Sequence, residues 1–215
     1  RAPGREAYPG DIFYIHSQMM ERAGYLKPEL GGGSMTFFPI VDILQGDVTG
    51  YVSSNLISMT DGQIYFSSAL FNKGVKPAID FGLSVSRIGN KAQWPSMKAL
   101  SGRLRLEYIQ YQELLQMTQL RTTGLSKEAE ERMKRGQAIT NILIQEKNNP
   151  ISMEAEIIFL FALSIGVLDN LSAVDVNKFK VDFPKQIREW FPELYDNLRK
   201  SQIMDDSSIA QLYEA

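Results

Sequence analysis

The sequence predicts an α/β segment with a mostly parallel sheet, followed by an all-α bundle. Residues 1–94 hold most of the glycine and proline, and short apolar runs lie between their turns, as is typical of buried strands. From residue 95 onward, apolar residues recur three or four positions apart, which is typical of helices. We therefore expect two domains, residues 1–94 and residues 95–215.

In the first domain we expect a helix between residues 14 and 26. Four apolar runs follow, each bounded by turn residues, and each is predicted to be a strand: 35–43, 51–59, 63–66 and 78–86. Asp61 and Gly62 suit a tight turn between the second and third runs.

The second domain should open with a long helix whose first turn contains Pro95. A second helix is expected after Ser126, a suitable N-cap, with Glu128 and Glu130 placed where the helix dipole favours acids. The asparagine–proline segment 148–150 should end it. The apolar stripes of these helices are interpreted as core packing and consist of Met97, Leu100, Leu104, Tyr108, Tyr111 and Leu115 in the first helix, and Ile139, Ile142 and Leu143 in the second.

Ser152 should cap a third helix that is apolar on every side and therefore central. Its twelve-residue apolar run, 157–168, is shorter than the roughly 20 residues needed to span a bilayer, so we interpret it as buried. A fourth helix should begin near Ala173 and be interrupted by Pro184 and again by Pro192.

Composition excludes several classes of function. The chain has no cysteine, which rules out disulfides, thiol catalysis and zinc–thiolate sites. Its one histidine, His16, cannot form a cluster of metal ligands, and no nucleophile–base pair surrounds it. A net charge of −2 does not indicate nucleic acid as a partner. The glycines at 31–33 are not followed by the lysine of a phosphate-binding loop, so the chain carries no complete catalytic set of its own.

Two polar residues stand near predicted strand ends. Ser58 precedes the turn at Asp61, and Arg87 ends the last predicted strand. Ligands of open parallel sheets lie beyond the carboxyl ends of strands, so these residues form a candidate site. Taken alone, Arg87 is more simply interpreted as a surface or salt-bridged arginine.

Five segments together resemble the α-subunit family of rotary F-type ATP synthases, in order and spacing. They are PGREAYPGDIFYIHS, GGGSMTFFPIVDILQGDVTGYV, LISMTDGQIYF, LFNKGVKPAIDFGLSVSRIGNKAQ and MKALSGRLRLEYIQYQEL. The resemblance runs from Arg1 to about Ser201. It implies the C-terminal part of a RecA-like P-loop NTPase core, without the P-loop, followed by the C-terminal helical domain.

The resemblance also implies a role for Arg87. In this family, α and β subunits alternate in a ring around a rotating central stalk, and catalysis occurs mainly on β. Each α subunit supplies an arginine in trans to the neighbouring β site, and the matching residue is Arg87, with Ser58 on the same interface. A guanidinium presents fixed donors that match phosphate oxygens.

The family's non-catalytic nucleotide pocket is matched less closely. Phe71 stands at its aromatic position, and Lys76–Pro77 stands where arginine–proline is usual. Gln145 matches the first of two glutamines, and Lys147 falls at the second. Leu44 and Ser53 also differ from the family, which usually has alanine and proline there. The expected ligand is ATP or ADP with Mg²⁺, whose metal ligands would lie outside this chain.

The family's remaining parts would come from other polypeptides. Because the first residue is arginine, we expect a fragment, a processed chain or one half of a split polypeptide, with a companion chain carrying the N-terminal half of α. The other expected partners are the β subunits, the central stalk γ subunit and the peripheral stalk. We expect the protein at the matrix side of the mitochondrial inner membrane or the cytoplasmic side of a bacterial plasma membrane. We expect no membrane-spanning segment in this chain. A second hypothesis is a structural subunit of an ATPase-derived assembly that does not synthesise ATP.

Overall fold

The computed structural model describes residues 2–4, 7–43, 46–119 and 126–214. Leu44 therefore lies outside the described residues. The chain divides into two compact units, Arg1–Ile64 with Ser84–Ile88, and Tyr65–Leu83 with Gly89–Ala215. Each unit is described by itself below.

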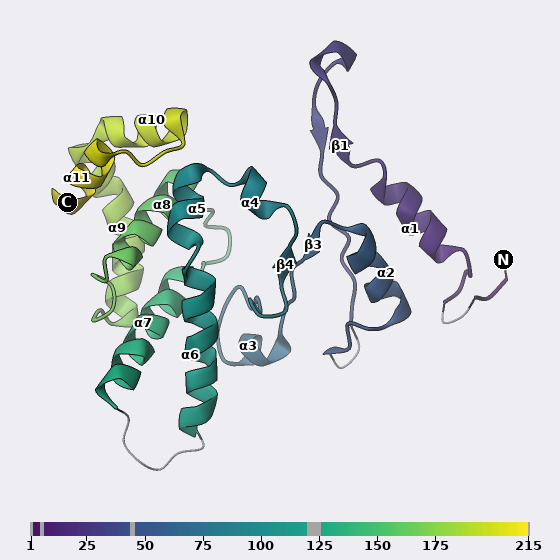
Figure 1. Ribbon diagram of the computed structural model, residues 1–215, viewed down its shortest axis with the longest axis horizontal. Helices are drawn as coiled ribbons and strands as arrows, with labels where there is room; N and C mark the ends of the chain where they lie inside the picture. The colour runs from purple at the N-terminus through teal and green to yellow at the C-terminus, as the bar shows by residue number, and fades with distance from the viewer. Residues whose placement is uncertain (1, 5–6, 44–45, 120–125, 215) are drawn as a thin grey trace. The chain divides into compact units, whose positions relative to one another are not determined.

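Among its described residues, the first unit contains two α-helices, one short 3₁₀ helix and two short antiparallel ladders (Figure 1). Its elements are α1 (Ile12–Met20), β1 (Gly24–Tyr25), η1 (Pro28–Leu30), β2 (Ser34–Met35), α2 (Tyr51–Met59), β3 (Gly62–Gln63) and β4 (Val85–Ser86). In the first ladder Gly24 pairs with Met35, and in the second Gly62 pairs with Ser86.

The strand predictions were largely wrong in this unit. The run 51–59 forms helix α2, and only the ends of the other runs pair as strands. Both ladders among the described residues are antiparallel, so the expected parallel sheet is not formed by these segments. A short apolar run does not distinguish a strand from a buried helical turn, because strands of a parallel sheet and buried helices share that pattern.

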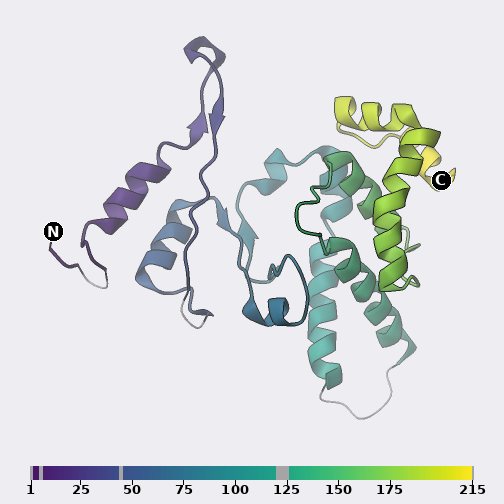
Figure 2. The ribbon, with the colours of Figure 1, turned by 180° about the vertical axis from the view of Figure 1, so that it is seen from behind.

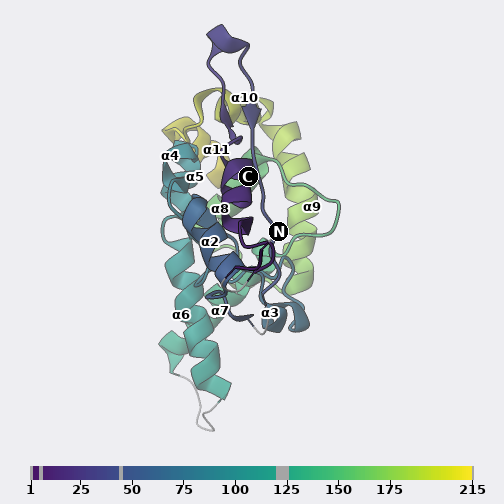
Figure 3. The same cartoon turned by 90° about the vertical axis from the view of Figure 1, so that its right-hand side faces the viewer.

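The second unit is a bundle of helices (Figure 2). Its elements are α3 (Ser68–Asn72), α4 (Gly89–Ala92), α5 (Pro95–Ser101), α6 (Leu104–Gln119), α7 (Lys127–Leu143), α8 (Met153–Ser164), α9 (Ala173–Trp190), α10 (Pro192–Ser201) and α11 (Asp206–Glu214). In Figure 3, α6 and α9 lie on opposite sides of this bundle, and α7 contacts both of them.

Most sequence signals for helix ends are confirmed in the bundle. Ser126 and Ser152 each accept a hydrogen bond from the backbone N–H three residues later, at 3.3 Å, as N-caps do. The predicted long first helix is divided into α5 and α6 at Gly102, whose low helix propensity favours a break there. The predicted interruption at Pro184 is wrong, because α9 continues through it to Trp190. The predicted interruption at Pro192 is confirmed, because α9 ends before it and α10 begins there.

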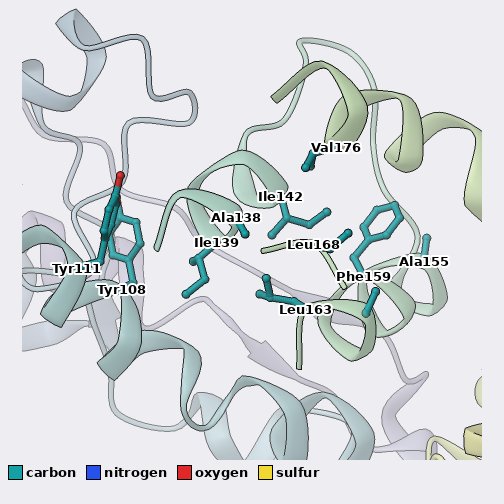
Figure 4. Packing of buried hydrophobic residues seen from close by; sticks show 11 residues of the cluster. Tyr108, Tyr111, Ala138, Ile139, Ile142, Ala155, Phe159, Leu163, Leu168 and Val176 are labelled. Atoms are coloured by element: carbon teal, nitrogen blue, oxygen red, sulfur yellow. The ribbon is translucent and has the colours of Figure 1, made fainter. Parts of the chain in front are cut away.

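Helix α8 lies between two clusters of buried side chains. Phe159 and Leu163 belong to one cluster, and Ile157, Ile158 and Phe161 to the other. The first cluster also joins α6 and α7 (Figure 4), through Tyr108, Tyr111, Ala138, Ile139 and Ile142. The prediction of a central helix that is apolar on every side is confirmed. None of the described helices is both long and apolar enough to cross a lipid bilayer.

One buried carboxylate at the start of α8 should make stability depend on pH. Glu154 is 3% exposed and accepts a hydrogen bond from Arg199 Nε at 2.8 Å. Burial raises the pKa of Glu154, but hydrogen bonds from its own backbone N–H, Arg199 and Ser152 outweigh burial, so the pKa lies below its usual value. Its contribution to stability is therefore present above the unfolded-state pKa and is lost as the pH falls through the folded-state pKa.

We expect Glu154→Gln to lower the free energy of unfolding at pH 7 and to remove part of its decline below about pH 5. Urea unfolding at several pH values between neutral and acid measures both effects. Glu128→Gln is the matched control, because Glu128 is exposed at the same position relative to the N-cap of α7. An acid profile of Glu154→Gln that overlays the wild type would contradict this assignment.

Candidate functional site

Arg87 lies at the C-terminal end of helix α2. Its Nη1 donates to the carbonyl of Thr60 at 3.2 Å, and its Nη2 donates to the carbonyl of Ile57 at 3.3 Å. Carbonyls in the last turn of a helix have no partner within the helix and carry partial negative charge, which favours a guanidinium there. These bonds use two of the five guanidinium N–H groups, and the side chain is exposed.

Ser58 occupies the same helix end. It is exposed, and its hydroxyl donates to the carbonyl of Asn55 at 2.7 Å. The two carbonyls that hold Arg87 belong to residues on either side of Ser58 in the chain. Both residues were expected at strand ends. Arg87 does follow strand β4, whereas Ser58 lies in helix α2, and the side chain of Arg87 reaches the end of that helix.

The start of α2 explains why this run is helical. Asp47 accepts hydrogen bonds from the N–H and the hydroxyl of Thr49, at 2.8 and 2.6 Å, which closes a turn before the helix. Ser53 is buried in the first helical turn and donates to the carbonyls of Val48 and Gly50, each at 3.0 Å.

A close backbone approach fixes the strand that leads to Arg87. A Cβ atom at Gly62 would lie 2.2 Å from the carbonyl oxygen of Val85, so only glycine fits this pairing. The N–H of Arg87 donates to the carbonyl of Asp61 at 2.8 Å. The hydroxyl of Thr60 lies 2.9 Å from the carbonyl oxygen of Gly62 and 3.0 Å from that of Leu56. The end of α2, the turn and β4 therefore hold Arg87 together.

An open hollow in the second unit contains three residues of the expected nucleotide pocket. Its volume is about 620 Å³. Its lining consists of Phe66, Ser67, Ser68, Phe71, Asn72, Lys76, Pro77 and Ala78. The Nζ of Lys76 lies 4.8 Å from the centre of the Phe71 ring, which is a cation–π arrangement.

A hollow of this size is large enough for a ligand the size of a nucleotide base with its sugar.

The remaining two residues of the expected pocket are placed differently. The backbone N–H of Gln145 donates to the carbonyl of Lys76 at 3.0 Å, so the main chain of Gln145 contacts a residue that lines the hollow. Its side-chain amide donates instead to the carbonyl of Asn149, also at 3.0 Å. Lys147 is exposed and is not among the residues that line the hollow. The structure therefore groups Phe71, Lys76 and Pro77 and leaves Lys147 apart.

The described residues contain no group of three or more histidine, cysteine, aspartate or glutamate side chains that could hold a metal ion. The two sites present the guanidinium of Arg87 and, in the hollow, the ammonium group of Lys76 and the ring of Phe71. Arg87 can bind phosphate oxygens through paired N–H donors, and Phe71 can stack against a base.

Comparison with known proteins places most of the chain in one family. Residues 1–86 match the model of the ATP synthase alpha/beta family, nucleotide-binding domain, and residues 93–215 match that of the ATP synthase alpha/beta chain, C terminal domain. Two curated relatives are both ATP synthase subunit alpha, from the Eklund 17B and Alaska E43 strains of Clostridium botulinum. Each is 41% identical over 212 residues, which cover 99% of this chain and 42% of the relative. The chain therefore belongs to the ATP synthase alpha/beta family.

Proposed function

We propose that the chain is the C-terminal part of a non-catalytic α subunit of a proton-translocating F-type ATP synthase. In this role Arg87 reaches across an interface to the phosphoryl group bound by a neighbouring β subunit, with Ser58 beside it. The observation that carries the proposal is the exposed guanidinium at the end of α2, held by the carbonyls of Ile57 and Thr60. An arginine supplied in this way stabilises the charge that develops on the transferring phosphoryl group.

The proposal assigns a second nucleotide, one that is not turned over, to the hollow around Phe71. The base would stack on the aromatic ring, and Lys76 would lie close to the ligand. Lysine cannot replace arginine in a planar stacked or bidentate contact, so binding should differ from that of family members with arginine. The ligand would be ATP or ADP with Mg²⁺, which would neutralise phosphate charge when bound.

We expect Phe71→Ala to weaken ADP binding at this non-catalytic site roughly 5- to 150-fold, because base–aromatic stacking contributes about 1–3 kcal/mol. Titration of the purified complex with a fluorescent ADP analogue measures the affinity. Trp190→Ala is the control, since Trp190 is an exposed aromatic residue of α9 that is not among the residues lining the hollow. Unchanged affinity in Phe71→Ala would refute the assignment of the hollow.

The first unit exposes several large apolar side chains that a partner should cover. Its described core is small, with Leu56 the buried apolar residue, whereas Leu30, Phe38 and Ile40 are 70%, 77% and 97% exposed. Apolar side chains exposed to this extent mark an interaction surface. The proposed partner is the remainder of an α-type RecA-like domain, carried on a companion polypeptide.

The proposed assembly also contains β subunits, the central stalk γ subunit and the peripheral stalk, at the surface of an energy-transducing membrane. That membrane is the mitochondrial inner membrane or a bacterial plasma membrane. Intact-mass analysis of the purified native complex tests this composition. We expect β subunits and a chain with the P-loop to accompany this one, and their absence would overturn the proposed assembly.

A second candidate is a structural subunit of an ATPase-derived assembly that does not synthesise ATP. The position of Lys76 over the face of Phe71 favours it, because this cation occupies space where a base would stack. This alternative predicts a complex without a proton-conducting membrane sector, and co-purification of that sector would exclude it.

A further inference from the structure

Lys180, on helix α9, reaches the C-terminal end of helix α7. Its Nζ donates to the carbonyl of Ile144, which is the C-cap of α7, and to the carbonyl of Asn141 at 3.4 Å. The last carbonyls of a helix lack partners within the helix, and a cation near them is favoured by the helix dipole. Lys180 therefore fixes the end of α7 from a neighbouring helix.

Gln145, the residue after Ile144, contacts the main chain of a residue that lines the hollow. The N–H of Gln145 donates to the carbonyl of Lys76 at 3.0 Å, and the side chain of Lys76 lies over Phe71. A continuous set of contacts thus runs from Lys180 through Ile144 and Gln145 to the wall of the hollow.

The surroundings of Lys180 distinguish it from a solvated surface lysine. Its side chain is only partly exposed, and burial lowers its pKa, while the charge of Glu146 acts in the opposite direction. A partly buried ammonium group needs hydrogen-bond acceptors to offset its lost hydration, and the two α7 carbonyls supply them. Lys178, two residues earlier on the same helix, is exposed.

We infer that Lys180 is a positioning residue for the nucleotide hollow, because it holds the end of α7 in the place from which Gln145 supports the main chain of Lys76. This inference rests on the proposed nucleotide-binding function of the hollow. It assigns to α9, a helix that contributes no residue to the lining, an effect on nucleotide affinity.

Lys180→Met tests this inference, since methionine keeps much of the length of the side chain but removes its donors and charge. Hydrogen exchange of the Gln145 amide in the full chain reports on the bond to Lys76. The affinity of the purified complex for a fluorescent ADP analogue reports on the hollow. Arg135→Met is the matched control, because Arg135 on α7 also donates to a carbonyl near a helix end, that of Leu163, and neither residue lines the hollow.

We expect Lys180→Met to accelerate exchange of the Gln145 amide and to weaken ADP binding roughly 2- to 30-fold, the range typical of coupling through packed networks. Lys180→Arg should restore both properties in part, and Arg135→Met should lower thermal stability without changing either. Unchanged exchange or unchanged ADP affinity in Lys180→Met overturns the inference. Failure of the proposed function is distinguishable, because it appears as unchanged ADP affinity in Phe71→Ala.

Discussion

Arg87→Ala is expected to reduce steady-state ATP turnover by the assembled complex by roughly 10³- to 10⁵-fold, the contribution of arginines supplied in trans in other nucleotidases. The reason is that the guanidinium would stabilise charge on the phosphoryl group in the transition state. Assembly should persist, because the side chain is exposed and bonds only to carbonyls in the contacts described above. Turnover measured at saturating ATP, alongside the subunit composition of the variant, gives both results.

Two further variants make the Arg87 test specific. Arg87→Lys keeps the charge but loses the planar pair of donors, so it should recover only part of the turnover. Arg22→Ala removes another exposed arginine of the same unit and should leave turnover near that of the wild type. Normal multi-site turnover in Arg87→Ala would eliminate the proposed role in trans.

Gly136→Ala is expected to destabilise the helical bundle more than most single substitutions. A Cβ atom at Gly136 would lie 2.0 to 2.5 Å from atoms of the Tyr111 side chain, so α6 and α7 would have to move apart. Overpacking of a core costs about 1–3 kcal/mol and sometimes more, and we expect the upper end because Tyr111 is itself buried. Urea unfolding measures the change in free energy.

Gly102→Ala is the control for this prediction. A Cβ atom there would lie 3.5 Å from the carbonyl oxygen of Lys98, an ordinary contact, and the backbone of Gly102 is already helical. Alanine has a higher helix propensity than glycine, so stability should stay constant or rise slightly. A stable Gly136→Ala variant would show that α6 and α7 do not cross as closely as described.

The sequence predicted the helical bundle better than the first unit, for a physical reason. Helix caps such as Ser126 and Ser152 act within a few residues, so their signals are local and were confirmed. The run 51–59 carries no such cap, because its N-cap is Gly50 and its first turn is held by the side chain of Ser53. Its apolar composition therefore suggested a strand where the structure has a helix.

The candidate sites, too, were predicted from the sequence only in part. The resemblance to the family directed attention to Arg87 and Phe71, but not to the contacts that hold them. The bonds of Arg87 to Thr60 and Ile57 join residues about 30 positions apart in the chain, and the bond from Lys180 to Ile144 spans 36 positions. Contacts between distant segments depend on the fold and leave no local pattern in the sequence.

The most direct test of the proposed role of Arg87 is a structure of the assembled complex with ADP and aluminium fluoride, which imitates a phosphoryl group in transfer. The proposal predicts that the guanidinium of Arg87 lies within hydrogen-bonding distance of the fluoride atoms in a site formed mainly by the neighbouring β subunit. A complex in which that site is filled while Arg87 remains distant from the fluoride atoms would contradict the proposal.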